Sequence, residues 1–240
     1  TVLPFINRVT GASLIDQGID AEAVFPVPSQ ISGFDRGAIG ILPGNLVRSV
    51  YSGYSLGKAI RRGYGSIAEG VDNTLARLEA ASGPSYTYLY FPQVDSAAHM
   101  SGVGSGATHA ALEDVNRSLE RLARDMPDGT KLVVTADHGH LDASPREPML
   151  IREDDEIGGM LRYPPAGDAR VNYYHVREDA IGRFAETYRE CMPSNVLLLT
   201  PDEIQDLQLL GPGEIPALTR TRMGDYISIC IDSAVVAWAA

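Results

Sequence analysis

The sequence has few cysteines, no basic tract and no long apolar stretch. Two cysteines in 240 residues, Cys191 and Cys230, are too few for a disulfide framework, so we expect both to be structural. No apolar run approaches the ~20 residues of a membrane-spanning helix, so no membrane segment is expected. Acidic residues outnumber basic ones by 31 to 20, a net charge of −11, which argues against binding a nucleic-acid polymer through its phosphates. Small molecules are better candidates for the partner.

The middle of the chain has the pattern of a strand, a helix and a second strand. Segments 86–91 and 131–136 are rich in aromatic and β-branched residues and follow turn residues. Between them, apolar residues recur at helical spacing over 112–126. Such a connection makes the two strands parallel, and ligands of open parallel sheets bind beyond the carboxyl ends of the strands. We therefore expect both carboxyl ends at one edge of a sheet.

Carboxylate and imidazole side chains follow both predicted strands. Asp95 and His99 follow the first, and Asp137, His138 and His140 follow the second. Neutral imidazole and carboxylate suit Zn²⁺, with Mn²⁺ or Fe as alternatives, whereas Ca²⁺ or Mg²⁺ would call mainly for oxygen ligands. Structural zinc sites usually use cysteine, which both clusters lack, so the pattern favours a catalytic metal site.

Each cluster taken alone has a plainer interpretation. Asp95 and His99 could be a turn-capping aspartate and a polar histidine, and Asp137 could cap a turn beside a solvated His138. Together, after neighbouring predicted strands, the clusters favour a metal site instead. A surface explanation does not predict that four of the five histidines fall in this one window, namely His99, His109, His138 and His140.

These motifs resemble those of the type I phosphodiesterase and nucleotide pyrophosphatase family, which belongs to the alkaline phosphatase superfamily. The resemblance rests on Asp95-Ser-Ala-Ala-His99, on the helix over 112–126 and on the Asp-His-Gly motif at Asp137. It extends more weakly to residues 5–26 and to Arg-Met-Gly-Asp at 222–225, and so covers most of the chain.

The resemblance implies an α/β fold with an alkaline-phosphatase-like sheet of mostly parallel strands flanked by helices. Residues 1–150 would form a partial α/β metal-binding core, and residues 151–240 a smaller α+β region that continues the same domain. Cytoplasmic localisation is favoured, although the amino end that the resemblance implies to be missing could hide a signal.

The resemblance also implies a two-metal hydrolase of phosphate esters. One metal would be bound by Asp95 and His99 with a third histidine near the carboxyl end, and the other by Asp137 and His138 with an early aspartate and a threonine or serine nucleophile. Two neighbouring cations stabilise the attacking and leaving oxygens of an in-line displacement. The implied substrate is a small phosphorylated molecule or nucleotide, and the oligomeric state stays open.

The sequence departs from the family pattern in several places. It has no histidine after His175, and no aspartate or nucleophile before Asp95 stands in a loop after a strand. We therefore expect a chain that is incomplete at both ends and a poor catalyst by itself. Ala98 stands where glycine is usual, and would be strained at positive φ. His140 replaces a common methionine; of a spare ligand, a substrate contact and a solvated side chain, the last is favoured.

Two other functions stay open. A metal-dependent phosphomutase of the same superfamily would need a serine nucleophile and basic positioning residues, for which Arg152, Arg162 and Arg170 are the candidates. A non-catalytic module that binds metal or phosphate is the other.

Local patterns predict the remaining elements. We expect helices over 5–17, 67–78 and 178–191 and one beginning at Thr200-Pro-Asp-Glu, strands over 21–27, 171–176 and 196–199, irregular segments over 31–44 and 142–159, and a hairpin of 226–230 with 234–239.

Overall fold

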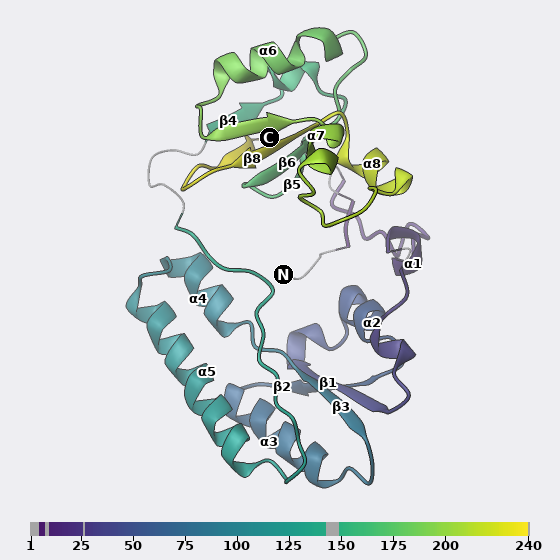
Figure 1. Ribbon diagram of the computed structural model, residues 1–240, viewed down its shortest axis with the longest axis vertical. Coiled ribbons are helices and arrows are strands. Elements are labelled where there is room, and N and C mark those ends of the chain that lie inside the picture. Colours follow the sequence, from purple (N-terminus) through teal and green to yellow (C-terminus); the bar gives the residue numbers. More distant parts are fainter. Residues whose placement is uncertain (1–4, 8–9, 26, 143–148, 240) are drawn as a thin grey trace. The chain divides into compact units, whose positions relative to one another are not determined.

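The computed structural model describes residues 5–7, 10–25, 27–142 and 149–239 (Figure 1). Its contacts divide the chain into two compact units, Thr1–His140 and Leu141–Ala240, here called the first and the second unit. Across the described ranges, no helix has the length and apolar character needed to cross a bilayer.

The first unit is built on a parallel sheet. Its strands β1 (Gly37–Pro43), β2 (Ile60–Tyr64) and β3 (Ser85–Leu89) lie in the order β2-β1-β3. Both pairs are parallel, with Ile39 of β1 opposite Ile60 of β2 and Thr87 of β3. The predicted α/β fold with a mostly parallel sheet flanked by helices is confirmed.

Helices cover both faces of this sheet. Helix α3 (Ile67–Glu79) follows β2, and its Gly70 lies so close to the sheet that an added Cβ would meet Tyr64, Leu89 and Phe91 at 3.2–3.4 Å. These side chains pack with Ile39 and Ile41 of β1 into one apolar cluster. Successive strand residues face opposite sides, so Gly40 faces away from α3.

The other face of β1 receives α2 (Val50–Leu56). A Cβ on Gly40 would lie 2.4 Å from a methyl carbon of Leu56, so a larger residue would force the Leu56 side chain of α2 to shift. The packing of Leu56 against β1 thus explains why a glycine stands inside this strand. The sequence predicted an irregular segment over 31–44; that prediction was wrong for residues 37–43, which form β1, where Gly37 and Gly40 lie close to the side chains of Arg77 and Leu56.

Two further helices complete this part of the unit. Helix α4 (Gln93–Ser101) follows β3, and α5 (Gly106–Asp125) begins after Ser105, whose side chain accepts a hydrogen bond from the Thr108 amide at 3.1 Å. Figure 1 shows α5 alongside α3, and the predicted helices over 67–78 and 112–126 are both confirmed, the second beginning earlier than expected. Short elements complete the unit: α1 (Ala21–Val24) and the 3₁₀ turn Ile31–Gly33 precede β1, and the 3₁₀ turn Gly44–Leu46 follows it.

Two predictions for the amino end were wrong. The described residues of 5–17 form turns, with an antiparallel bridge between Ile6 and Ser13 and with Gly11 at a φ of 70°, and they are not helical. Residues 21–24 are helical and not a strand, because the Asp20 side chain accepts the Ala23 amide hydrogen at 2.9 Å and starts α1.

The second strand of the predicted strand-helix-strand pattern, over residues 131–136, is not formed. The segment belongs to no helix or strand and is mostly exposed, with Val133 and Val134 73% and 63% exposed. β-Branched residues favour an extended backbone, but a strand also needs a neighbour for its amide and carbonyl groups. Among the described residues, β3 pairs with β1 alone, so the outer edge of β3 stays unpaired and residues 131–136 add no strand to the sheet.

The second unit has an α+β architecture. Strands β5 (Ala166–Gly167), β6 (Val171–Tyr174), β8 (Tyr226–Cys230) and β7 (Val196–Leu199) form an antiparallel sheet in this order. Strands β4 (Met149–Arg152) and β9 (Val236–Ala239) form a separate parallel pair. The remaining elements are the 3₁₀ turn Gly158–Met160 and helices α6 (Ile181–Cys191), α7 (Pro201–Asp206) and α8 (Ala217–Met223).

Most local predictions for this unit are confirmed. The strands near 171–176 and 196–199 and the helix near 178–191 are present, and Thr200 and Glu203 form the capping box that begins α7. The predicted hairpin of 226–239 is wrong, because β9 leaves β8 and pairs with β4, Ala237 opposite Leu150. The segment 142–159, predicted as a loop, contains β4; its residues 143–148 lie outside the described part. Cys191 is exposed and Cys230 buried, both as free thiols.

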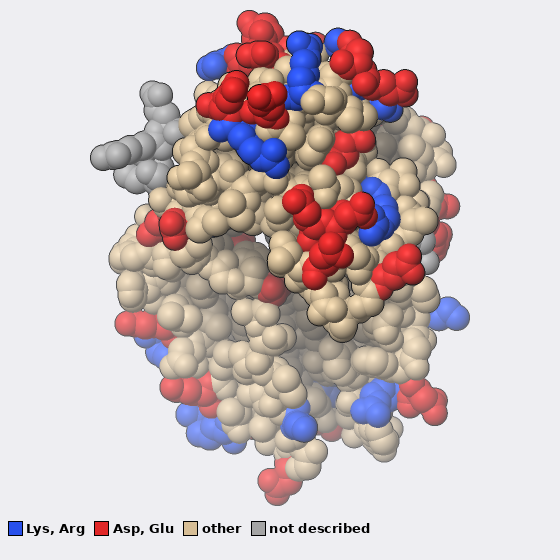
Figure 2. All heavy atoms as spheres, turned by 45° about the horizontal axis from the view of Figure 1, so that its top comes forward, with Lys and Arg blue, Asp and Glu red and all other residues tan. Residues whose placement is uncertain are grey.

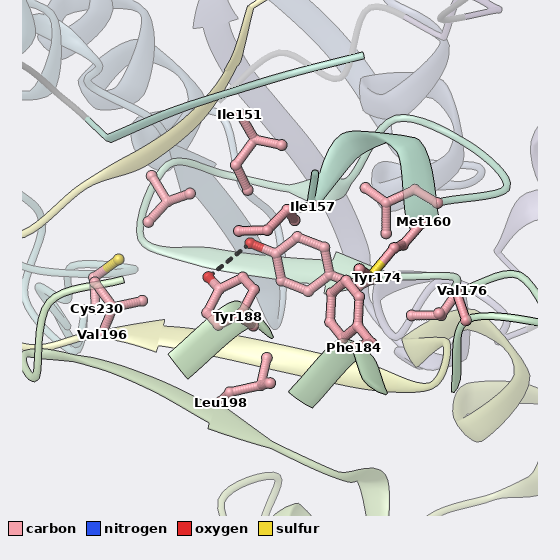
Figure 3. Close-up of a cluster of buried hydrophobic side chains, with 13 residues drawn as sticks. Ile151, Ile157, Met160, Tyr174, Val176, Phe184, Tyr188, Val196, Leu198 and Cys230 are labelled. Atoms are coloured by element: carbon pink, nitrogen blue, oxygen red, sulfur yellow. Dashed lines mark hydrogen bonds between the residues drawn. The ribbon is translucent and has the colours of Figure 1, made fainter. Parts of the chain in front are cut away.

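Three aromatic side chains form the centre of this unit (Figure 3). Tyr174 of β6 and Phe184 and Tyr188 of α6 are fully buried and point toward one another. The Tyr174 hydroxyl lies 3.0 Å from the Tyr188 hydroxyl and 3.1 Å from Ser228 Oγ of β8. Burial raises the pKa of Tyr174, so this hydroxyl stays neutral and hydrogen-bonded.

The Gly-Asp pair at 224–225 makes the turn from α8 into β8. Gly224 has a φ of 73°, and an added Cβ would lie 2.4 Å from the Tyr174 carbonyl oxygen. Asp225 then donates its amide to that oxygen and accepts the Val176 amide hydrogen on its carboxylate at 2.7 Å. The part of the motif that the structure explains is therefore a backbone junction.

We expect Gly224→Ala to lower the free energy of unfolding of the second unit by about 2–4 kcal/mol, because alanine combines positive φ with a backbone clash. Gly182→Ala is the matched control: Gly182 lies in α6 with nothing within 4 Å of an added Cβ, so this change should be neutral or stabilising by up to about 1 kcal/mol. Urea unfolding followed by circular dichroism measures both, and equal midpoints would contradict the role of Gly224.

Tyr174→Phe should cost about 1–3 kcal/mol of unfolding free energy, because it leaves the buried Tyr188 and Ser228 hydroxyls short of a partner. Tyr163→Phe, at a side chain 64% exposed, removes the same atom and should change stability by less than about 0.5 kcal/mol. If both variants unfold at the wild-type urea concentration, the hydroxyl network contributes nothing.

Candidate metal centre

Helix α4 places Asp95 and His99 on one face. Asp95 lies in the first turn of α4 and His99 in the last, and residues four apart in a helix are neighbours. His99 Nε2 lies 3.3 Å from Asp95 Oδ1. Ala98 between them is helical and 7% exposed and is not among the residues with positive φ, so the strain considered for it does not arise.

The second cluster comes from the segment that follows α5. His140 Nε2 lies 3.2 Å from Asp95 Oδ1, and His138 Nε2 lies 3.7 Å from the same oxygen. The imidazole ring of His140 lies between the other two, with centroid distances of 5.1 Å to His99 and to His138. The expectation that both clusters meet in space therefore holds, although only the first follows a strand of the sheet.

Asp95 Oδ1 is the common neighbour of the three imidazoles. This oxygen is shielded from solvent, and no described residue donates a hydrogen bond to it. A shielded carboxylate oxygen without a hydrogen bond costs free energy unless a positive charge compensates it. Protonated imidazole or a bound cation would supply that charge.

The tautomer of His138 follows from its other contact. His138 Nδ1 lies 2.8 Å from the Gly139 carbonyl oxygen, which can only accept, so Nδ1 carries the hydrogen and neutral imidazole keeps its lone pair on Nε2. That carbonyl contact and the charge of Asp137 raise the pKa of His138. In this tautomer Nε2 can bind a metal ion, and it lies 3.6 Å from Asp137 Oδ2 and 3.7 Å from Asp95 Oδ1.

Asp137 lies at the outer side of the cluster. Its Oδ2 is 3.6 Å from His138 Nε2, and its side chain is 69% exposed. Burial, with the charges of Asp137 and Asp95 as further causes, raises the pKa of Tyr90. Both carboxylates therefore act on the same tyrosine, which stacks on Tyr88 at a centroid distance of 6.4 Å.

The structure brings Asp95, His99 and His140 into one group, whereas the sequence analysis paired Asp95 with His99 and left His140 aside. Their candidate ligand atoms all lie within 4.8 Å of one another. The sequence favoured a solvated His140, but its side chain is only 20% exposed, against 68% for His99. No signal in the sequence indicates this position, because residues 131–142 form no helix or strand that would set which way His140 faces.

His109, the other histidine in this part of the sequence, is not in that group. It lies on α5 with Nδ1 3.0 Å from the Ser105 carbonyl oxygen, and its side chain is exposed.

Comparison with solved structures shows the fold. Two structures of the murine ectonucleotide pyrophosphatase/phosphodiesterase 5 are similar to this chain. One is of an inactive variant in complex with AMP (TM-score 0.55, 16% identity), and the other is of the same protein (TM-score 0.53, 15% identity). Each match covers 97% of this chain and 62% of the murine chain. The sequence thus spans less than two thirds of the structures it matches.

Comparison of the sequence itself is more specific. No curated protein matches it significantly. The family model for type I phosphodiesterase / nucleotide pyrophosphatase, however, matches residues 13–230, which is most of the chain. The chain belongs to the type I phosphodiesterase / nucleotide pyrophosphatase family.

Proposed function

We propose that this chain carries the metal-binding part of a hydrolase of phosphate esters that acts through a two-metal centre. Asp95 and His99 would hold one cation, and Asp137 and His138 the other. The observation that carries the proposal is the shielded Asp95 Oδ1 with imidazole nitrogens at 3.2, 3.3 and 3.7 Å. The nucleophile stays unassigned among these residues.

The donor set fits a zinc-type cation. Ligand atoms about 2.0–2.1 Å from a tetrahedral zinc ion lie about 3.3 Å from each other. The 3.3 Å between Asp95 Oδ1 and His99 Nε2 matches that spacing. Imidazole and carboxylate also accept Mn²⁺ or Fe, so the identity of the metal rests on chemistry that favours Zn²⁺ without excluding these two.

The protein's own residues would orient the site. The backbone of α4 fixes the spacing of Asp95 and His99, and the Gly139 carbonyl holds His138 with Nε2 inward. When bound, two cations stabilise negative charge on the phosphoryl oxygens and lower the pKa of a nucleophile. Asp137 and His99 keep more than two thirds of their side chains exposed, which leaves the cluster open to a ligand from solvent.

The substrate would be a small phosphorylated molecule or nucleotide. The family is named for phosphodiester and nucleotide pyrophosphate hydrolysis, and a structure of the similar murine protein contains AMP. On the face drawn in Figure 2, lysine and arginine side chains are scattered among acidic ones and form no continuous basic track. A polyanion would find little to bind there, whereas one phosphate group needs only the cations.

A phosphomutase is less well supported. Arg170, one of the basic candidates, donates to the backbone carbonyls of Cys230, Asp232 and Ala234. Arg162 donates to the Val176 carbonyl at 2.8 Å. Both guanidinium groups therefore brace loops of the second unit, a role that leaves fewer donors for a substrate.

Zinc binding tests the two-metal centre directly. After removal of metal with a chelator, the chain should take up about two zinc ions, and Asp95→Ala and Asp137→Ala should each lower the stoichiometry, because each removes a ligand. Asp128→Ala changes an exposed carboxylate of the first unit and serves as the control. Equilibrium dialysis with metal analysis gives the numbers; uptake unaffected by both ligand variants would refute the proposal.

Hydrolysis tests the reaction class. We expect any turnover of p-nitrophenyl phosphate or bis(p-nitrophenyl) phosphate to stop on chelation, to return with zinc, and to fall to the chelated rate in Asp137→Ala. The ratio of the two rates separates monoester from diester hydrolysis. Zinc uptake without turnover of either compound would favour a metal- or phosphate-binding module.

A further inference from the structure

We propose that His140 is the third protein ligand of the cation held by Asp95 and His99. The inference rests on the proposed function and goes beyond it. It gives a role to His140, which stands where the family commonly has methionine and for which a solvated side chain was favoured. The segment 137–140 would then supply ligands to both cations, His138 and Asp137 to one and His140 to the other.

Distances support a shared cation. His140 Nε2 and His99 Nε2 lie 3.2 Å and 3.3 Å from Asp95 Oδ1, and both values match the ~3.3 Å between two ligands of a tetrahedral zinc ion. All three candidate ligand atoms lie within 4.8 Å of one another. His138 Nε2 is farther from Asp95 Oδ1, at 3.7 Å, and lies beside Asp137 instead.

Burial supports the same assignment. The side chain of His140 is 20% exposed, the least among the three histidines that lie near Asp95 Oδ1, and its ring meets that of His99 edge to face at 82°. A histidine that served only as a solvated side chain would have no reason to occupy this position. The shielded oxygen beside it, which receives no hydrogen bond from the described residues, is what a cation would neutralise.

The resulting ligand set has a chemical consequence. Two imidazoles and one carboxylate leave the fourth position of a tetrahedral zinc ion open, as in catalytic sites of this type. All three ligands come from the first unit, from α4 and from the segment after α5. The site would therefore be complete without a ligand from the second unit.

Cobalt as a spectroscopic substitute for zinc tests the role of His140 in the full chain. We expect His140→Ala to lower the affinity for one of the two cations at least tenfold and to reduce the visible absorption of tetrahedral cobalt. His109→Ala, at an exposed histidine on α5, should leave both the affinity and the absorption unchanged. Competition with a chromophoric chelator gives the affinities, and circular dichroism confirms that each variant is folded.

A second variant gives a positive signal. His140→Cys places a thiolate at the same position, and a new sulfur-to-cobalt charge-transfer band would show that residue 140 coordinates the ion. Wild-type affinity in His140→Ala together with no such band would overturn the inference. If Asp95→Ala lowers metal binding in the same experiments, only the role of His140 fails; if Asp95→Ala has no effect either, the two-metal proposal fails with it.

Discussion

The candidate site is built around one constraint: the negative charge on a carboxylate oxygen, Asp95 Oδ1, must be compensated. The oxygen is removed from water, and three imidazoles from two separate segments approach it. Such an arrangement is stable only if the interaction with a positive charge offsets the free-energy cost of removing the oxygen from water. The sheet serves this constraint at a distance: β3 sets where α4 begins, and α5 returns the chain so that 137–140 can reach α4.

The two units differ in how they are stabilised. The first has a small apolar cluster around Ile39, Ile41 and Tyr64, between a parallel sheet and α3. The second has a larger core that closes around Tyr174, Phe184 and Tyr188 and includes a satisfied hydroxyl network. Each unit therefore has its own core, and the candidate ligands all belong to the unit with the smaller one.

Local signals were the part of the fold that could be predicted from the sequence. The capping box at Thr200 and the apolar periodicity of 67–78 act within a few residues, and both elements are present. Elements that depend on distant partners were predicted less well. Gly40 makes sense only once Leu56 packs on it, and residues 131–136 have strand-forming side chains but pair with no strand among the described residues.

The candidate site divides in the same way. Residue chemistry indicated the two clusters of aspartate and histidine, and the family resemblance then implied which four of these residues are the ligands. The helical placement of Asp95 and His99 could have been expected from their i, i+4 spacing. The position of His140 could not be fixed, because it depends on how a segment without regular structure returns to α4.

The exposed valines of the segment 131–136 have a consequence for how the chain behaves in concentrated solution. Val133 and Val134 stand 73% and 63% exposed in a short apolar stretch whose backbone pairs with no strand among the described residues. Such a stretch is a template for adding a strand from another molecule, the first step of aggregation. The candidate ligands His138 and His140 lie just beyond it, so a bound cation would tether this end of the segment and disfavour that assembly by mass action. Metal content would then control the colloidal behaviour of the protein as well as its chemistry.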